Sequence, residues 1–129
     1  MMIKLKQRRK QLSHLLTLLF TTFLIANQAY SAPAYPEKPI KIVIGFPAGG
    51  PLDQHARLLV DKLQGILGQP IIVDYKPGAG GGVGAEIVAK SPPDGYTLML
   101  ANTGVMVING ALYSKLPYNT LRDFAPIAR

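Results

Sequence analysis

Two glycine-rich stretches carry the residues of this sequence that are best suited to bind a ligand. In the first, FPAGGPLD, an apolar segment must turn sharply into a helix at Gly49-Gly50. Residues without a Cβ let a ligand approach the main chain, and the helix start adds unpaired N–H groups and the positive end of a dipole. Such a turn, called here the first joint (residues 46–50), suits a carboxylate or a phosphate. The candidate donors are the amides of Ala48, Gly49, Gly50 and Leu52. Alternatively, the glycines only make the turn and Asp53 only favours the first helical turn.

The second stretch, PGAGGGVGAE, repeats this chemistry at the start of another expected helix, and residues 78–81 are called the second joint. It contains Gly80-x-Gly82-x-x-Ala85, one form of the dinucleotide-binding fingerprint. That fingerprint requires an acidic residue about 20 residues further on, at the end of the next strand. Ala101-Asn102 stand there instead. An exported dinucleotide-binding oxidoreductase domain is therefore kept only as an alternative, and no cofactor is predicted.

Residues that could act as nucleophiles, bases or metal ligands are sparse. His55 is interpreted as a surface histidine, and neither Ser91 nor Ser114 lies in a nucleophile elbow. The acidic residues show no spacing typical of metal ligands. Three tyrosines are interpreted as packing residues rather than pocket residues: Tyr96, Tyr113 and Tyr118. We therefore predict no catalytic site, no metal site and no enzyme.

The elements that must position the two joints follow from the apolar pattern. Strands are predicted at 39–46, 70–75 and 97–101, an amphipathic helix at 52–67 and a second helix at about 83–90. Short joints between alternating strands and helices predict an α/β fold with a doubly wound, mostly parallel sheet. Right-handed crossovers then place both joints at the carboxyl edge of that sheet, where open α/β sheets bind ligands. Beyond Gly104 we expect a short helical turn, a loop around Pro117-Tyr118-Asn119 and the start of a strand at Ala125.

The N-terminal segment has the layout of a secretory signal peptide. Basic residues without acids occupy 1–14, an apolar run follows at 15–26, and small residues come next. The run is shorter than the roughly 20 residues that a membrane-spanning helix needs. We predict a signal peptide at 1–32, cleaved within 31–34, and a periplasmic mature protein; a retained membrane anchor is the alternative.

The charge of the chain is explained mostly by this leader. The formal charge is +7, from 14 basic and 7 acidic residues. The leader holds five of the basic residues, so the mature chain keeps only +2. A nucleic-acid partner is therefore not indicated.

Several segments together resemble the Bug family, the extracytoplasmic solute receptors of tripartite tricarboxylate transporters. The resemblance is carried by YPEKPIKIVIGFPAGGPLDQHARLL, LGQPIIVDYKPGAGGGVGAEIVAKSPPDGYTLML and NGALYSKLPY…DFAPIA, in collinear order. It implies part of a type II periplasmic binding protein, with residues 33–129 as a partial N-terminal lobe. Because family members run to two lobes, we expect a truncated or fragmentary member; a non-binding remnant is the alternative.

The resemblance also implies a function and a site. Such receptors bind a small carboxylated solute on main-chain donors of the two joints and pass it to two integral membrane subunits. The ligand-binding residues expected on this ground are Phe46, Ala48, Gly49, Gly50, Asp53, Gly78, Ala79, Gly80, Gly81, Asn102 and Thr103. The chain departs from the family pattern at Leu52, where a hydroxyl residue is common, and at Met106, where many members carry a histidine.

Overall fold

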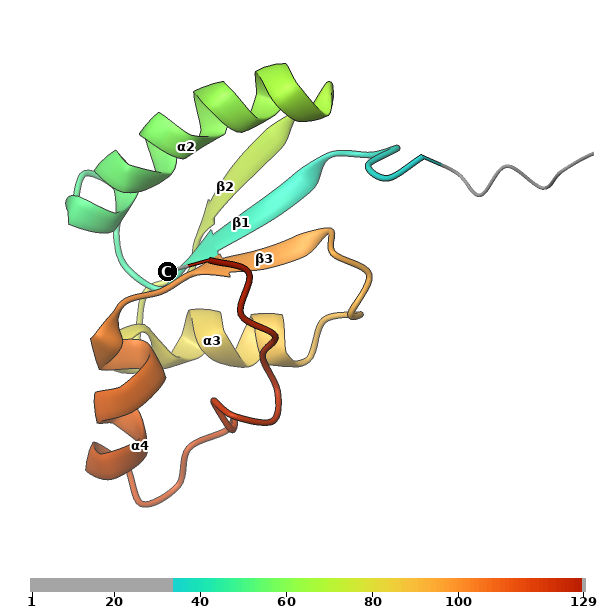
Figure 1. The fold of residues 1–129 in the computed structure, drawn as a ribbon. Helices are drawn as coiled ribbons and strands as arrows, with labels where there is room; N and C mark the ends of the chain where they lie inside the picture. Colours follow the sequence, from blue (N-terminus) through green and yellow to red (C-terminus); the bar gives the residue numbers. More distant parts are fainter. Residues whose placement is uncertain (1–33, 129) are drawn as a thin grey trace, which may run out of the picture. The chain divides into compact units, whose positions relative to one another are not determined.

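A computed structural model describes residues 34–128, so the predicted signal peptide lies outside the described part of the chain. Three parallel strands form one sheet in the order β2-β1-β3: β1 (Ile40–Ile44), β2 (Ile71–Tyr75) and β3 (Thr97–Leu100). The helical segments are α2 (Pro51–Leu67), η1 (Ala79–Gly81), α3 (Gly82–Ala89), η2 (Gly104–Ile108) and α4 (Asn109–Leu112). Figure 1 shows this alternation of strands and helices. Each of the three predicted strands and both predicted helices is present.

β1 is the central strand of the sheet, and its buried residues lie on both faces. Ile40, Ile42 and Ile44 are buried together with Ala56 of α2, whereas Val43 is fully buried on the opposite face. In the register of the sheet, Ile42 lies between Val73 of β2 and Leu98 of β3. Lys41 is the exception, since it is exposed, and the other four residues give the nearly continuous apolar run that is typical of a strand buried on both faces.

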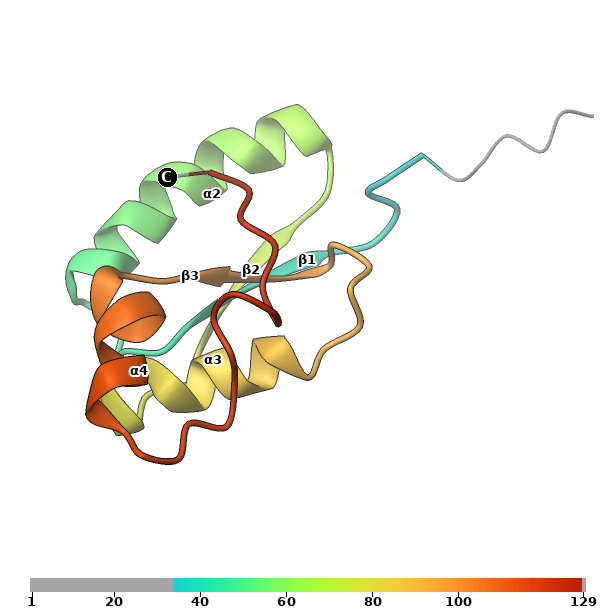
Figure 2. The ribbon, with the colours of Figure 1, turned by 60° about the horizontal axis from the view of Figure 1, so that its bottom comes forward.

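The helices cover opposite faces of the sheet. α2 lies over one face and α3 over the other, with α4 beside one end of α3 on the same side, as both views show (Figures 1 and 2). β1 connects through α2 to its neighbour β2, and β2 connects through α3 across β1 to β3. These connections run in opposite directions along the sheet, so right-handed crossovers require helices on opposite faces. The predicted doubly wound α/β fold is confirmed.

The segment after β3 departs most from the sequence prediction. A short π-helix, η2, continues directly into α4, so the expected short helical turn is longer than predicted. No strand is present from Ala125 to Ala128 within the described residues, so that prediction was wrong. Pro126 has no N–H to donate to a neighbouring strand, which disfavours pairing there.

The second core lies beneath α3. Ala85, Val105 and Tyr118 are its buried residues, and Phe124 packs edge-on against the Tyr118 ring at 5.8 Å between centroids. The loop after α4 thus closes over α3 rather than extending the sheet. Among residues 34–128, no helix is long and apolar enough to cross a membrane.

Candidate functional site

The carboxyl edge of the sheet contains a topological switch point between β1 and β3. The chain leaving β1 turns toward α2 on one face, whereas the chain leaving β3 turns toward η2 and α4 on the other (Figure 2). Adjacent parallel strands whose connections diverge in this way leave a crevice at their carboxyl ends, and open α/β sheets bind ligands there. The first joint and the segment 101–104 border this position.

The second joint meets the end of β1 through main-chain contact. A Cβ placed on Gly45 would lie 2.6 Å from both the Cα and the carbonyl oxygen of Gly81. A Cβ on Gly84 would lie 3.0 Å from the Cα of Gly45. The two joints are therefore brought together, as the topology predicts, and glycine is required where they meet.

The second joint is a left-handed turn. Its four residues have φ angles of 137° at Gly78, 47° at Ala79, 58° at Gly80 and 87° at Gly81. A run of positive φ suits glycine, but Ala79 carries a Cβ and is strained by it. Strain of this kind is kept where the surrounding structure enforces it, and it clusters at functional positions.

The left-handed turn divides the amides of the second joint into two groups. The N–H of Gly81 donates to the carbonyl of Gly78 at 3.0 Å, and that of Gly82 donates to Ala79. Among residues 34–128, the amides of Ala79 and Gly80 have no hydrogen-bond partner, and both residues are exposed. Gly81, by contrast, is buried against Phe46 and Val105, so its role is packing.

Asn109 supports the second joint by a hydrogen bond to its main chain, a role that was not predicted from the sequence. Its side chain is 5% exposed, and its Nδ2 donates to the carbonyl of Gly80 and to the Tyr118 hydroxyl, at 3.2 Å each. The Tyr118 hydroxyl in turn donates to the carbonyl of Val105 at 2.7 Å. The packing role predicted for Tyr118 is confirmed. A polar residue in an apolar helical stretch was the only available signal for Asn109.

The first joint is organised by a buried carboxylate. Asp53, 2% exposed, accepts a hydrogen bond from the N–H of Gly49 at 2.7 Å, from Arg57 Nε at 3.1 Å and from the Tyr75 hydroxyl at 2.5 Å. The bonds from Tyr75 and from Gly49 lower the pKa of the Asp53 carboxyl. The bond to Asp53 also raises the pKa of the Tyr75 hydroxyl, which keeps the hydroxyl protonated as the donor.

These bonds narrow the set of predicted ligand contacts. The N–H of Gly49 donates to Asp53, so neither this amide nor the carboxylate is free to bind a solute. Asp53 lies in the first turn of α2, as the alternative interpretation states, but it also bonds outside the helix. Within the described residues, the amides of Ala48 and Gly50 have no partner. The first joint therefore keeps two of the predicted donors.

The segment 101–104, which follows β3, lies at the same edge of the sheet. Asn102 and Thr103 are exposed, and Asn102 Oδ1 accepts the N–H of Val105 at 3.1 Å, which caps the following helical segment. Leu52 and Met106, the departures from the family pattern, pack against the first and the second core respectively. At both positions an apolar side chain therefore adds to packing.

The remaining tyrosines differ in their distance from these donors: the Tyr113 hydroxyl lies beside the second joint, 3.6 Å from where a Cβ on Gly80 would stand. Tyr96 packs against Tyr35 before β3, at the amino edge of the sheet, with ring centroids 5.0 Å apart. Tyr113 is 39% exposed, and His55 is exposed on α2. Within residues 34–128, no group of three His, Cys, Asp or Glu side chains could hold a metal ion.

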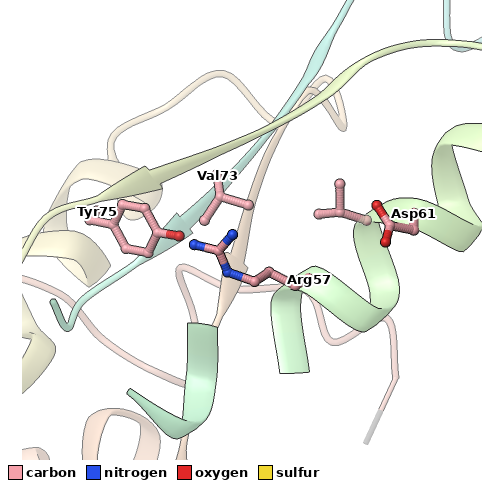
Figure 3. A pocket seen from close by; sticks show the side chains of 5 residues that line it. Arg57, Asp61, Val73 and Tyr75 are labelled. Atoms are coloured by element: carbon pink, nitrogen blue, oxygen red, sulfur yellow. The ribbon is translucent and has the colours of Figure 1, made fainter. Parts of the chain in front are cut away.

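A hollow of about 320 Å³ lies between α2 and β2, lined by Arg57, Val60, Asp61, Val73 and Tyr75. Figure 3 shows the Tyr75 hydroxyl and the Arg57 guanidinium facing one another along its wall. None of the predicted ligand-binding residues lines it. Arg57 and Tyr75 nevertheless connect the hollow to the first joint, because both bond Asp53.

The fold is an α/β unit of the kind found in periplasmic binding proteins. Residues 55–129 match the model of the tripartite tricarboxylate transporter family receptor. The chain belongs to this family, which confirms the resemblance stated from the sequence. The family consists of solute receptors rather than enzymes, so the oxidoreductase alternative is set aside.

Comparison with individual relatives agrees with this assignment. Protein BugT from Bordetella pertussis is 42% identical over 99 residues, which cover 76% of this chain and 30% of the relative. MatC from Rhodopseudomonas palustris, solved with bound malate, is 39% identical with a TM-score of 0.69, over 71% of this chain and 31% of that one. A second R. palustris structure, solved with adipate, is 32% identical with a TM-score of 0.65, over 67% and 29%. This chain thus spans about 30% of the length of the relatives it matches.

Proposed function

We propose that residues 33–129 form part of the N-terminal lobe of a receptor that binds a small carboxylated solute at the carboxyl edge of the sheet. The observation that carries the proposal is the second joint, where the exposed amides of Ala79 and Gly80 have no partner within the described residues. In the first joint, the amides of the exposed Ala48 and the half-buried Gly50 also have no partner within the described residues. Amides at helix starts bind anions through their N–H groups and the helix dipole.

Recognition by neutral donors fits the charges around the joints. Lys76, which precedes the second joint, pairs with Asp74 at 3.1 Å, and Arg57 pairs with Asp53. These cations are already engaged, so main-chain N–H groups supply the positive potential for the solute. The Nδ2 of Asn102 and the hydroxyl of Thr103 add exposed polar groups at the same edge.

The solute class follows from the relatives by analogy. MatC was solved with malate and its R. palustris neighbour with adipate, and both ligands are dicarboxylates. We extend that class to this chain. Export by the predicted signal peptide, a periplasmic location and delivery to two integral membrane subunits complete the proposal, in keeping with the family's transport role.

The first test is amide spectroscopy on the chain itself. ¹⁵N-labelled protein is titrated with L-malate and with adipate, and the uncharged diamide of malate serves as the control. We expect both dicarboxylates to shift the amides of Ala79, Gly80, Ala48 and Gly50, and the diamide to leave them unchanged. Equal shifts with the diamide would contradict recognition of a carboxylate.

The second test supplies the parts that this chain does not span. Residues 35–128 replace the matching segment of MatC, and malate binding is measured by calorimetry. We expect the chimera to keep malate affinity within about tenfold of MatC, since the joints are reproduced on the same fold. Gly80→Ala, whose Cβ would lie 3.2 Å from Asn109 Oδ1 at positive φ, should weaken binding. Gly65→Ala, whose Cβ meets nothing within 4 Å, should not. Loss of malate binding in the chimera, with no amide shifts in the chain, would refute the proposal.

A further inference from the structure

Asp53 and Tyr75 connect the two joints in a way that the sequence pattern does not show. Tyr75 is the last residue of β2 and lies three positions before the second joint. Its hydroxyl donates to Asp53 Oδ1, while Asp53 Oδ2 accepts the N–H of Gly49 in the first joint. A single carboxylate therefore bonds one joint directly and the strand leading to the other.

The carboxylate is fully engaged and shielded from solvent. The Asp53 side chain is 3% exposed, and each oxygen has at least one donor. A buried carboxylate is tolerated when it is paired and hydrogen-bonded, and removing one donor leaves the charge undersatisfied. Arg57, whose side chain is 68% exposed, bonds the carboxylate from the same helix, whereas Tyr75 bonds it from β2. The Tyr75 bond is thus the one that crosses between elements.

We propose that Asp53 and Tyr75 are positioning residues that set the spacing between the two joints. This inference rests on the proposed solute site, because the spacing determines how the free amides of the two joints face one solute. On the side of the sheet where α3 lies, the loops are held by the Gly45–Gly81 and Phe46–Gly81 contacts, and the N–H of Lys76 donates to the carbonyl of Ile44 at 2.8 Å. The Asp53–Tyr75 bond, between residues 22 apart in sequence, adds a side-chain tie between the start of α2 and the end of β2, and we assign to it the orientation of the first joint relative to the second.

A purely structural interpretation makes a different prediction. If Asp53 only caps α2, losing the Tyr75 hydroxyl lowers stability and perturbs the start of that helix, but it leaves the second joint unchanged. If the bond positions the joints, the amides of Ala79 and Gly80 change their surroundings as well. The two interpretations therefore differ at residues that touch neither Asp53 nor the hydroxyl.

The experiment compares two tyrosine-to-phenylalanine variants by ¹⁵N–¹H spectra of the ligand-free chain. Tyr75→Phe removes the hydroxyl bonded to Asp53, and Tyr96→Phe removes a hydroxyl that accepts the N–H of Glu37 at 2.9 Å near the amino edge. We expect Y75F to shift the amides of Gly49, Ala79 and Gly80, and Y96F to leave them in place. Unshifted Ala79 and Gly80 amides in Y75F would overturn the proposal, whether or not any solute binds.

Two further measurements separate the outcomes. Arg57→Gln removes the cation but keeps the Tyr75 bond, so its Ala79 and Gly80 amides should match wild type; shifts as large as those of Y75F would contradict the proposal. If Y75F does not fold, Asp53→Asn takes its place with the same expected shifts.

In the MatC chimera, Y75F should weaken malate binding about fivefold or more and Y96F should not. A chimera that never binds malate refutes the proposed function but leaves the spectra to decide the positioning role.

Discussion

Replacing Gly45, which directly precedes the first joint, by alanine would push the main chain there away from Gly81 of the second joint. The new Cβ would lie 2.6 Å from two main-chain atoms of Gly81, whereas ordinary contacts begin near 3.4 Å. The loops would have to separate by about 0.8 Å. Main-chain atoms cannot move aside by changing rotamer, and α3 presses on the same point through Gly84. Overpacking of this kind costs about 1–3 kcal/mol and occasionally more, so we expect a loss of about 2–4 kcal/mol in the free energy of unfolding.

Urea unfolding followed by circular dichroism measures this loss. With a slope of about 1–2 kcal/mol/M, the midpoint of G45A should fall by more than about 1 M. Gly65→Ala is the matched control, because its Cβ would stand in open space within α2. Alanine is the better helix former, so G65A should gain about 0.5–1 kcal/mol. A G45A midpoint equal to that of wild type would refute the main-chain contact between the joints.

Three further perturbations follow from the same structure. Tyr118→Phe leaves two buried partners without their hydroxyl and should lower the free energy of unfolding by about 1–3 kcal/mol in thermal melts, whereas Tyr113→Phe, at a more exposed ring, should change it little. Ala79→Gly relieves the φ of 47° and should stabilise by up to about 1 kcal/mol in urea; a clear loss would contradict the left-handed turn. The lowered pKa of Asp53 means that the unfolded chain binds its proton first as the pH falls, so wild-type stability should be complete near neutral pH and decline below about pH 5. Asp53→Asn should lower stability at pH 7 and flatten this decline between pH 7 and 3; an unchanged slope would show that Asp53 does not contribute to it.

The sequence predicted the features that local patterns encode. The apolar runs located three strands and two helices, and the glycines located both joints at one edge, because each signal lies within a few neighbouring residues. Local patterns did not predict which residues of the joints pack and which keep free amides. That Gly81 packs while Ala79 and Gly80 keep free amides depends on the φ angles of the whole turn. That Asn109 supports Gly80 depends on a contact between residues 29 apart.

The same limit explains the interpretation of Asp53. An acid in the first turn of a helix is expected to interact with the helix dipole, and the sequence offers no sign of a partner on another element. The hydroxyl that completes the site comes from β2, 22 residues away. Only the parallel pairing of β1 with β2 brings Tyr75 beside α2.

The glycine contact between the joints has a consequence for protein engineering. The main chains of Gly45 and Gly81 are so close that Gly45 has no room for a Cβ. A loop transplanted from another receptor into either joint must therefore fit the opposite joint to within a few tenths of an ångström. Libraries that randomise one joint alone would lose most members to misfolding before selectivity could be screened. The two joints, with Gly84 beneath them, are therefore the smallest unit that can be exchanged to alter what such a receptor recognises.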